Sequence, residues 1–213
     1  TIVLVALIIG WQSYNSGREA LEQQAIKQLM STRDIKKTQI EDYFKTIQNQ
    51  ILTFADDRMI ISAAKEFKAA FKDYRNEVGF RDIDALKSSV ASYYQNDFTR
   101  EYHKRNSDQY LDLNTIVESL DRESVALQYS FIKANPHPLG EKDKLDKPDN
   151  DSRYSQLHQR YHPHIRHYLN AFEYYDIFIV DPKTGDIIYS VFKELDFSTS
   201  LIDGPYAGSG IGQ

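Results

Sequence analysis

Cysteine is absent from this sequence of 213 residues. Its absence excludes disulfide bonds, zinc sites built on thiolates and a cysteine nucleophile. An excess of positive charge is also lacking, because 26 Lys and Arg residues face 31 Asp and Glu residues, for a net charge of −5. Nucleic acid is therefore not an expected partner, since phosphate contacts require a basic face.

Signatures of catalysis are missing as well. The chain contains no phosphate-binding loop, no serine nucleophile elbow and no kinase or cyclase motif. The glycine cluster at 204–212 lacks the lysine of a phosphate-binding loop. We therefore predict that the chain is not an enzyme and carries no cofactor.

An uninterrupted apolar run stands at the N-terminus, where Ile2–Ile9 is followed by Trp11 and Tyr14. A helix that spans a bilayer needs roughly 20 residues, so this run is too short to span one alone. Trp and Tyr favour membrane interfaces. We interpret residues 1–11 as the C-terminal end of a transmembrane helix that starts before this sequence, with a secretory signal peptide as the alternative.

Proline is absent before Pro136, so the first part of the chain has no residue that breaks a helix by lacking a backbone N–H. The pattern from Gln12 to Ala55 is helical and corresponds to about 66 Å at 1.5 Å per residue. Spacings of four and three alternate in an apolar seam formed by Ile40, Phe44, Ile47, Ile51 and Phe54. Such spacing is typical of coiled coils. We predict a stalk helix that pairs with a later helix or with a second copy of the chain, and we expect a homodimer.

Further helical stretches follow the predicted stalk. One ends at Gly79, the next covers 83–98, and a third has Asn114 or Ser119 as its expected N-cap. Residues 135–151 are punctuated by Pro and Gly and predict a loop that is mobile or wraps to line a site. These patterns divide the chain into a membrane-helix end at 1–11, a stalk helix with its following helix at 12–78, and a helical segment leading into a small sheet at 79–213.

The strongest strand signal lies near the C-terminus. Two β-rich runs, Tyr175–Val180 and Ile187–Phe192, are separated by a turn that contains Pro182 and Gly185. Because Pro presets φ and Gly tolerates positive φ, the pattern predicts a β-hairpin. A helix over 154–172 is predicted to precede it. The expected fold class is mainly α with an α+β part.

One short stretch holds four of the six histidines, which are His158, His162, His164 and His167. His158 and His162 are four residues apart and share a helix face, as a metal pair would. Gln159 stands where a zinc protease has its general base, and Pro163 is expected to interrupt the helix or start a new one. Our main interpretation is partly buried histidines hydrogen-bonded around a pocket, without a metal. A metal-binding hydrolase built on His158–His167 is the alternative.

Three runs of residues point to a known family. They are NPHPLGEKDKL at 135–145, YSQLHQRYHP at 154–163, and YYDIFIVDPKTGDIIYSVFKELDFSTSL at 174–201 with GPYA at 204–207. Together they resemble the extracytoplasmic sensor region of bacterial methyl-accepting chemotaxis receptors. That region is of the Cache type, an extracellular relative of PAS domains.

The resemblance implies a long N-terminal helix beside PAS-like modules, each an antiparallel sheet flanked by helices. Residues 79–213 would include the start of the membrane-distal module, with a sheet truncated at the C-terminus. The chain would be a membrane-anchored sensor that faces the periplasm at the bacterial inner membrane and acts in chemotaxis. As an alternative to a chemotaxis receptor, the chain could be the same sensor region of a histidine kinase or a nucleotide cyclase. A further interpretation is a structural envelope protein whose helices make only coiled-coil contacts.

A sensor of this kind would bind a small-molecule ligand, whose identity is unknown, between the sheet and a covering loop or helix. Polar-tipped and aromatic side chains beside the sheet suit a small polar ligand. The candidate ligand-binding residues are Tyr154, His158, Tyr161 and His162 on the last helix, with Tyr175, Tyr189 and Lys193 on or near the hairpin.

Overall fold

A computed structural model describes residues 2–106 and 112–213 of the protein. The chain divides into two compact units, with the boundary between Asp57 and Arg58. Helices account for most of the described residues, and one small antiparallel sheet is present among them. The predicted class, mainly α with a small β part, is confirmed.

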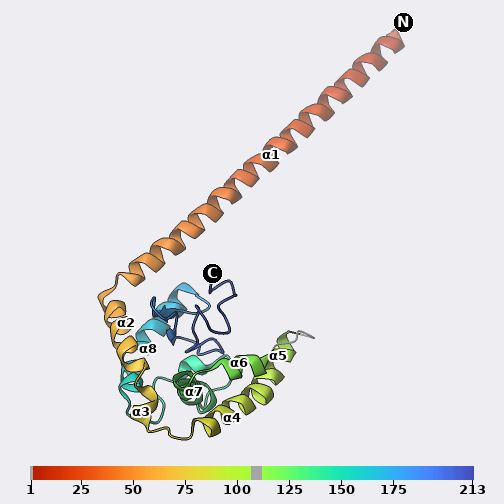
Figure 1. The fold of residues 1–213 in the computed structure, drawn as a ribbon. Coiled ribbons are helices and arrows are strands. Elements are labelled where there is room, and N and C mark those ends of the chain that lie inside the picture. The colour runs from red at the N-terminus through yellow and green to blue at the C-terminus, as the bar shows by residue number, and fades with distance from the viewer. Residues whose placement is uncertain (1, 107–111) are drawn as a thin grey trace. The chain divides into compact units, whose positions relative to one another are not determined.

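The first unit is a single helix, α1 (Ile2–Ala55), which Figure 1 shows as a continuous ribbon. Its 54 residues correspond to about 80 Å at 1.5 Å per residue. No residue of α1 is buried, and Leu21 and Phe44 are 69% and 64% exposed. The long helix predicted over Gln12–Ala55 is confirmed and extends back through the apolar run. Within the described residues, no helix combines the length and the apolar character that crossing a membrane requires.

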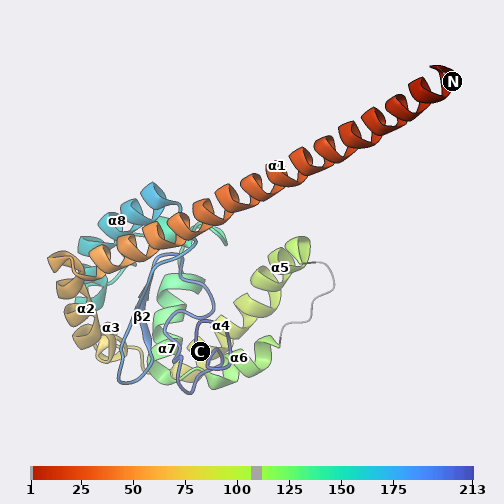
Figure 2. The ribbon, with the colours of Figure 1, turned by 90° about the horizontal axis from the view of Figure 1, so that it is seen from above.

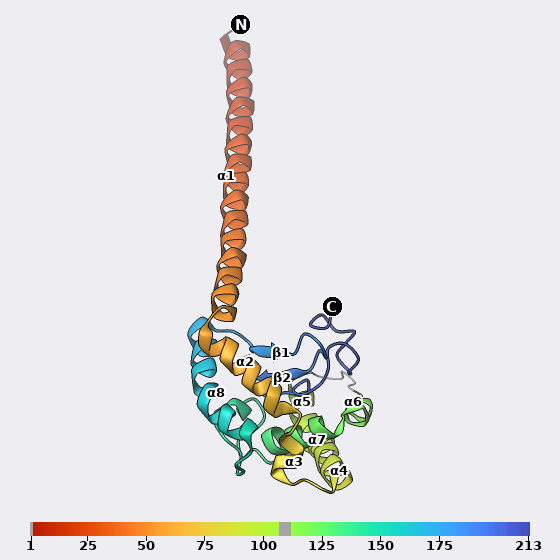
Figure 3. The ribbon, with the colours of Figure 1, turned by 60° about the vertical axis from the view of Figure 1, so that its left-hand side comes forward.

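The second unit contains helices that surround a hairpin (Figure 3). The α-helices are α2 (Arg58–Phe71), α3 (Tyr74–Val78), α4 (Ile83–Tyr93), α5 (Thr99–Arg105), α6 (Leu113–Ser119), α7 (Arg122–Gln128) and α8 (Arg153–Phe172). Short π-helical segments continue α4 and α7 as η1 (Tyr94–Phe98) and η2 (Tyr129–Lys133), and a 3-10 turn forms η3 (Lys142–Lys144). The strands are β1 (Phe178–Val180) and β2 (Ile187–Ser190).

Capping residues set several of these helix ends. Gly79 ends α3 as predicted, with a φ of 77° that glycine adopts without strain. The predicted caps Asn114 and Ser119 are wrong, because both lie inside α6. Asp112 caps α6 by accepting from the amide of residue 115 at 3.1 Å, and Asp121 caps α7 by accepting from the amide of residue 124 at 2.6 Å. A carboxylate before each helix satisfies amides that have no partner inside the helix.

Helix α8 continues through Pro163, so the predicted interruption at this proline is wrong. Proline lacks the N–H that would bond the preceding turn, which costs roughly 3 kcal/mol in a helix interior. A buried face formed by Tyr154, Leu157, Tyr161, Ile165 and Leu169 runs along both halves of the helix. Burial of these side chains, each worth about 1.5–3 kcal/mol, outweighs the proline and keeps the helix in one piece.

The hairpin confirms the predicted turn, although its strands are shorter than the predicted runs. β1 pairs with β2 in antiparallel register, with Ile179 opposite Tyr189. Gly185 has a φ of 75° and donates its amide to the carbonyl of Asp181 at 2.8 Å. Beyond β2 the chain returns along its other edge, where the amide of Ile187 donates to the carbonyl of residue 199 at 2.9 Å. The edge of β2 is thereby partly paired.

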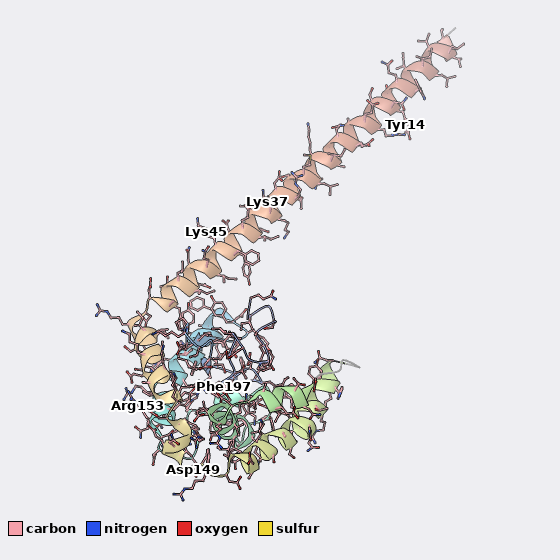
Figure 4. The ribbon with its side chains drawn as sticks, viewed as in Figure 1. Tyr14, Lys37, Lys45, Asp149, Arg153 and Phe197 are labelled. Carbon is pink, nitrogen blue, oxygen red and sulfur yellow. The ribbon has the colours of Figure 1, made fainter. Side chains whose placement is uncertain are left out.

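The core of the second unit includes the place where α2 packs on α8 and on β2, and where Tyr154 of α8 bonds to β2. The ring centroid of Phe67 in α2 is 5.0 Å from those of Tyr154 and Tyr189. Figure 2 shows α2 and α8 on one side of β2 and α4, α6 and α7 on the other. Phe197 sits among crowded side chains in Figure 4, with its ring 6.0 Å from that of Phe131. Because a two-stranded sheet alone is marginal, this aromatic packing is what holds the hairpin.

Candidate functional site

Five of the seven predicted ligand-binding residues meet behind β2. We call this group the polar cluster, and each of its members is at most 2% exposed: Tyr154, His158, His162, Tyr189 and Lys193. The hydroxyl of Tyr154 donates to the carbonyl of Ile188 at 2.7 Å, which fixes α8 on β2. These five side chains are therefore enclosed by protein and lie within the core.

The other two predicted residues lie elsewhere. Tyr161 is 7% exposed, and its hydroxyl donates to Glu66 at 2.9 Å, which ties α8 to α2. Tyr175 is 77% exposed, and its hydroxyl donates to Glu194 at 3.0 Å. The predicted residues therefore lie in three different environments: the polar cluster, the contact between α8 and α2, and the surface. Only Tyr175 is exposed to solvent.

The two histidines of the polar cluster are held neutral. His162 accepts from the Tyr189 hydroxyl through Nδ1 at 2.6 Å and donates to the carbonyl of Asp143 through Nε2 at 2.5 Å. His158 stacks on it, with centroids 4.2 Å apart, and donates to the carbonyl of Asp146 at 2.7 Å. Burial, followed by the nearby charge of Lys193, lowers the pKa of His158 well below its usual range and that of His162 to about 2. The predicted loop over 135–151 thus wraps onto these rings.

A metal site on the histidines lacks a donor set. Both ring nitrogens of His162 are engaged in hydrogen bonds. His164 and His167 are exposed, whereas His158 and His162 are buried. Within residues 2–106 and 112–213, no group of three His, Cys, Asp or Glu side chains is arranged to hold a metal ion. The Nε2 atom of His158 is buried without a hydrogen-bond partner, but two histidines alone do not make a zinc site.

Lys193 is a buried lysine among aromatic rings. Its Nζ donates to the carbonyl of Ser190 and lies 4.4 Å from the ring centroid of Tyr189 and 5.1 Å from that of Phe197. Its backbone φ is 58°, an uncommon value for a residue with a side chain. Burial lowers the pKa of Lys193, and the charge of Asp176 opposes this effect. The lysine therefore belongs to the core.

Asp176 fixes the turn that follows β2. Its Oδ1 accepts from the amides of Ile177, Val191 and Phe192 at 2.6, 2.9 and 3.3 Å. Its Oδ2 is buried without a hydrogen-bond partner, and burial raises the pKa of this carboxyl. Two of these three amides belong to Val191 and Phe192, so the carboxylate of Asp176 fixes the backbone directly after Ser190.

A surface pocket of about 310 Å³ opens beside this turn. We call it the acidic pocket, and it is lined by Phe98, Glu101, Tyr102, Asn106, Leu139, Gly140, Tyr175, Glu194, Leu195, Asp196 and Tyr206. Gln128 supports its wall from behind, because its side-chain amide donates to the carbonyls of Leu195 and Phe197 at 3.2 and 2.7 Å. The pocket is therefore built on a segment that the core holds in place.

Negative charge is concentrated in the acidic pocket. Burial, followed by the charges of Asp176 and Glu194, raises the pKa of Asp196 to about 6. The Oδ1 atom of Asp196 is buried and has no hydrogen-bond partner. Burial and the charge of Glu194 also raise the pKa of Tyr175 to about 12. The raised pKa values mean that ionisation of Asp196 and of Tyr175 is less favourable here than in water, because each adds negative charge beside other carboxylates.

Sequence reasoning named Tyr175 but missed Glu194, Asp196 and Tyr206. A signal for two of them was present in the run KELDF. Lys193, Leu195 and Phe197 are buried, whereas Glu194 and Asp196 between them are partly exposed. Buried and partly exposed side chains thus alternate along this non-strand segment, and the partly exposed Glu194 and Asp196 line the pocket.

No protein family model, no curated protein and no solved structure matches the chain. The fold alone does not identify an activity, because one fold serves many functions. Function is therefore argued from the geometry of the polar cluster and the acidic pocket.

Proposed function

We propose that this chain is the extracytoplasmic ligand-sensing region of a transmembrane chemoreceptor of the Cache type. The observation that carries the proposal is the position of the segment 190–197. On one side this segment contributes Lys193 to the polar cluster, and on the other it contributes Glu194 and Asp196 to the acidic pocket. A ligand in the pocket therefore acts on a segment that belongs to the core.

The core connects this segment to α2, the helix that follows α1 in the chain. Phe67 of α2 packs on Tyr189 of β2, and Nζ of Lys68 lies 2.8 Å from the carboxylate of Asp181 at the hairpin turn. A ligand that favours one packing of the hairpin also favours one packing of α2. Signalling through such a coupling needs a differential binding free energy of about 1–3 kcal/mol.

The exposed seam of α1 supports the receptor layout. Ile40, Phe44 and Ile51 are 56%, 64% and 53% exposed and recur at coiled-coil spacing. A second copy of the chain would bury this seam in a homodimer. In this proposal α1 leads to a membrane anchor, and the second unit faces the periplasm of a bacterium.

Three other functions remain distinguishable from this one. The same sensor could serve a histidine kinase or a nucleotide cyclase, which changes the output and not the ligand-binding part. A hydrolase on the histidines requires a donor set that is not found among the described residues. A structural envelope protein would bind no small molecule, and this difference makes it testable.

A thermal-shift screen of the whole chain tests the proposal. The panel holds amino acids, organic acids, amines and divalent metals. A ligand that binds the folded state at 100 times its Kd stabilises it by about 2.7 kcal/mol, so a saturable rise in melting temperature within one compound class is expected. A folded protein whose melting temperature no compound raises would contradict ligand sensing. A rise with zinc alone, lost in His158→Ala, would instead support the hydrolase.

A further inference from the structure

We propose that the acidic pocket binds a small organic cation of the alkylammonium class. This inference rests on the proposed sensing function and adds the chemical class of the ligand and the place where it binds. Aromatic walls, two carboxylates without an ion pair among the described residues, and an unpaired buried acceptor meet at one cavity, and each of these features favours a cation.

The first feature is the aromatic lining. Phe98 and Tyr102 stack at 5.8 Å between ring centroids on one wall of the pocket, and Tyr175 and Tyr206 contribute two further rings. Aromatic faces carry negative potential and attract ammonium groups within about 6 Å of the ring centroid. The same chain already uses this interaction in its core, where Lys193 lies over the ring of Tyr189.

The second feature is the charge balance of the lining. Among the described residues that line the pocket, three are carboxylates and none is Lys, Arg or His. Lys104 pairs with Glu101 at 3.0 Å, but no ion pair to Glu194 or Asp196 is found within the described part of the chain. Asp176 lies close enough to raise the pKa of Asp196 further. An anionic ligand would meet net repulsion here, whereas a cation would supply the missing opposite charge.

The third feature is the Oδ1 atom of Asp196, which is buried and has no hydrogen-bond partner. Buried acceptors in folded proteins are almost always paired with a donor. The nearby hydroxyl of Tyr175 donates to Glu194 instead. The protein covers this oxygen, so an ammonium group in the pocket would stabilise the Asp196 carboxylate through its opposite charge.

The size of the pocket limits the ligand to a small molecule. Its volume of about 310 Å³ lies at the lower end of the range of about 300–1,000 Å³ that is usual for small-molecule pockets. Choline and putrescine are suitable probes of this size. Choline presents a quaternary ammonium without N–H donors, and putrescine presents two primary ammonium groups, so the pair separates cation–aromatic attraction from hydrogen bonding to Asp196.

Isothermal titration calorimetry on the whole chain tests the inference. The titrants are choline, putrescine, acetate and the neutral carbon analogue of choline, in which a tert-butyl group replaces the trimethylammonium. We expect saturable binding of at least one cation, and at least tenfold weaker binding of the neutral analogue and of acetate. The substitution Asp196→Asn should weaken cation binding at least tenfold, and Asp203→Asn, at an exposed carboxylate, should not.

The stability of Asp196→Asn separates loss of the site from loss of the fold. Burial raises the pKa of Asp196, so its ionised form is unfavourable near pH 8 and the variant should melt at a higher temperature than the wild type. A variant that is more stable but binds no cation supports the site. Unchanged cation affinity in Asp196→Asn, or equal binding of the neutral analogue, would overturn the inference.

The failure of this inference differs from the failure of the proposed function. If neither cation binds but another compound class in the thermal-shift panel does, the ligand class is wrong and the sensing function stands. If no compound of any class binds the folded chain, both are wrong.

Discussion

Replacing His162 with glutamine should protect the protein from acid. The side-chain amide of glutamine can donate to the carbonyl of Asp143 and accept from the hydroxyl of Tyr189, as the imidazole does at 2.5 and 2.6 Å. It cannot take up a proton. The variant therefore removes one titration while keeping both hydrogen bonds and most of the packing.

The magnitude follows from the pKa of His162, which burial lowers to about 2 from its usual 6.5. A depressed folded-state pKa gives stability that is present above pH 6.5 and is lost as the pH falls, because only the unfolded chain takes up the proton. The loss is about 1.4 kcal/mol per pH unit below 6.5, which gives about 2 kcal/mol at pH 5. Asp176 and Asp196, whose pKa values are raised, act in the opposite direction but do so in both proteins.

Urea unfolding followed by circular dichroism at pH 5, 6, 7 and 8 measures this effect. The free energy of unfolding of His162→Gln, relative to the wild type, should rise by about 2 kcal/mol between pH 8 and pH 5. His164→Gln, at an exposed position of the same helix, should show no such change. A constant difference between His162→Gln and the wild type across this range would refute the neutral, buried state of His162.

Three other substitutions test the fold by thermal and urea unfolding. Pro163→Ala should stabilise the chain by up to about 3 kcal/mol, since it restores an N–H inside α8; destabilisation would show that the proline is needed there. Gly185→Ala should destabilise by about 1–3 kcal/mol, because φ is 75° and a Cβ would lie 2.7 Å from a neighbouring side chain, whereas Gly208→Ala meets nothing within 4 Å; equal effects would contradict the turn. Phe197→Ala should cost about 3–5 kcal/mol and Phe172→Ala, 44% exposed, much less.

Much of the fold could be predicted because its signals are local. The long helix over 12–55 follows from apolar spacing and missing proline, and the hairpin turn follows from Pro182 and Gly185. The continuation of α8 through Pro163 could not be predicted locally, since it depends on burial against α2 and β2. Tertiary packing of the buried face, and not helix propensity, therefore keeps α8 continuous at Pro163.

The site was predicted less completely for a related reason. Polar-tipped residues near a sheet suggest a pocket, but Tyr154 and His162 satisfy their polar atoms within the core. The acidic pocket joins residues from η1, the loop after η2 and the chain after β2, which are far apart in sequence. Only the alternation through Glu194 and Asp196 is visible locally.

The coupling between the acidic pocket and α2 is the central claim, and hydrogen–deuterium exchange tests it most directly. Amides of α2 (Arg58–Phe71) are followed with and without a saturating concentration of whichever of choline and putrescine binds more tightly. Because α2 packs on β2, the account predicts slower exchange in both the 190–197 segment and α2 when the ligand is bound, and no change in Asp196→Asn. Slower exchange around the pocket with unchanged exchange in α2 would contradict it.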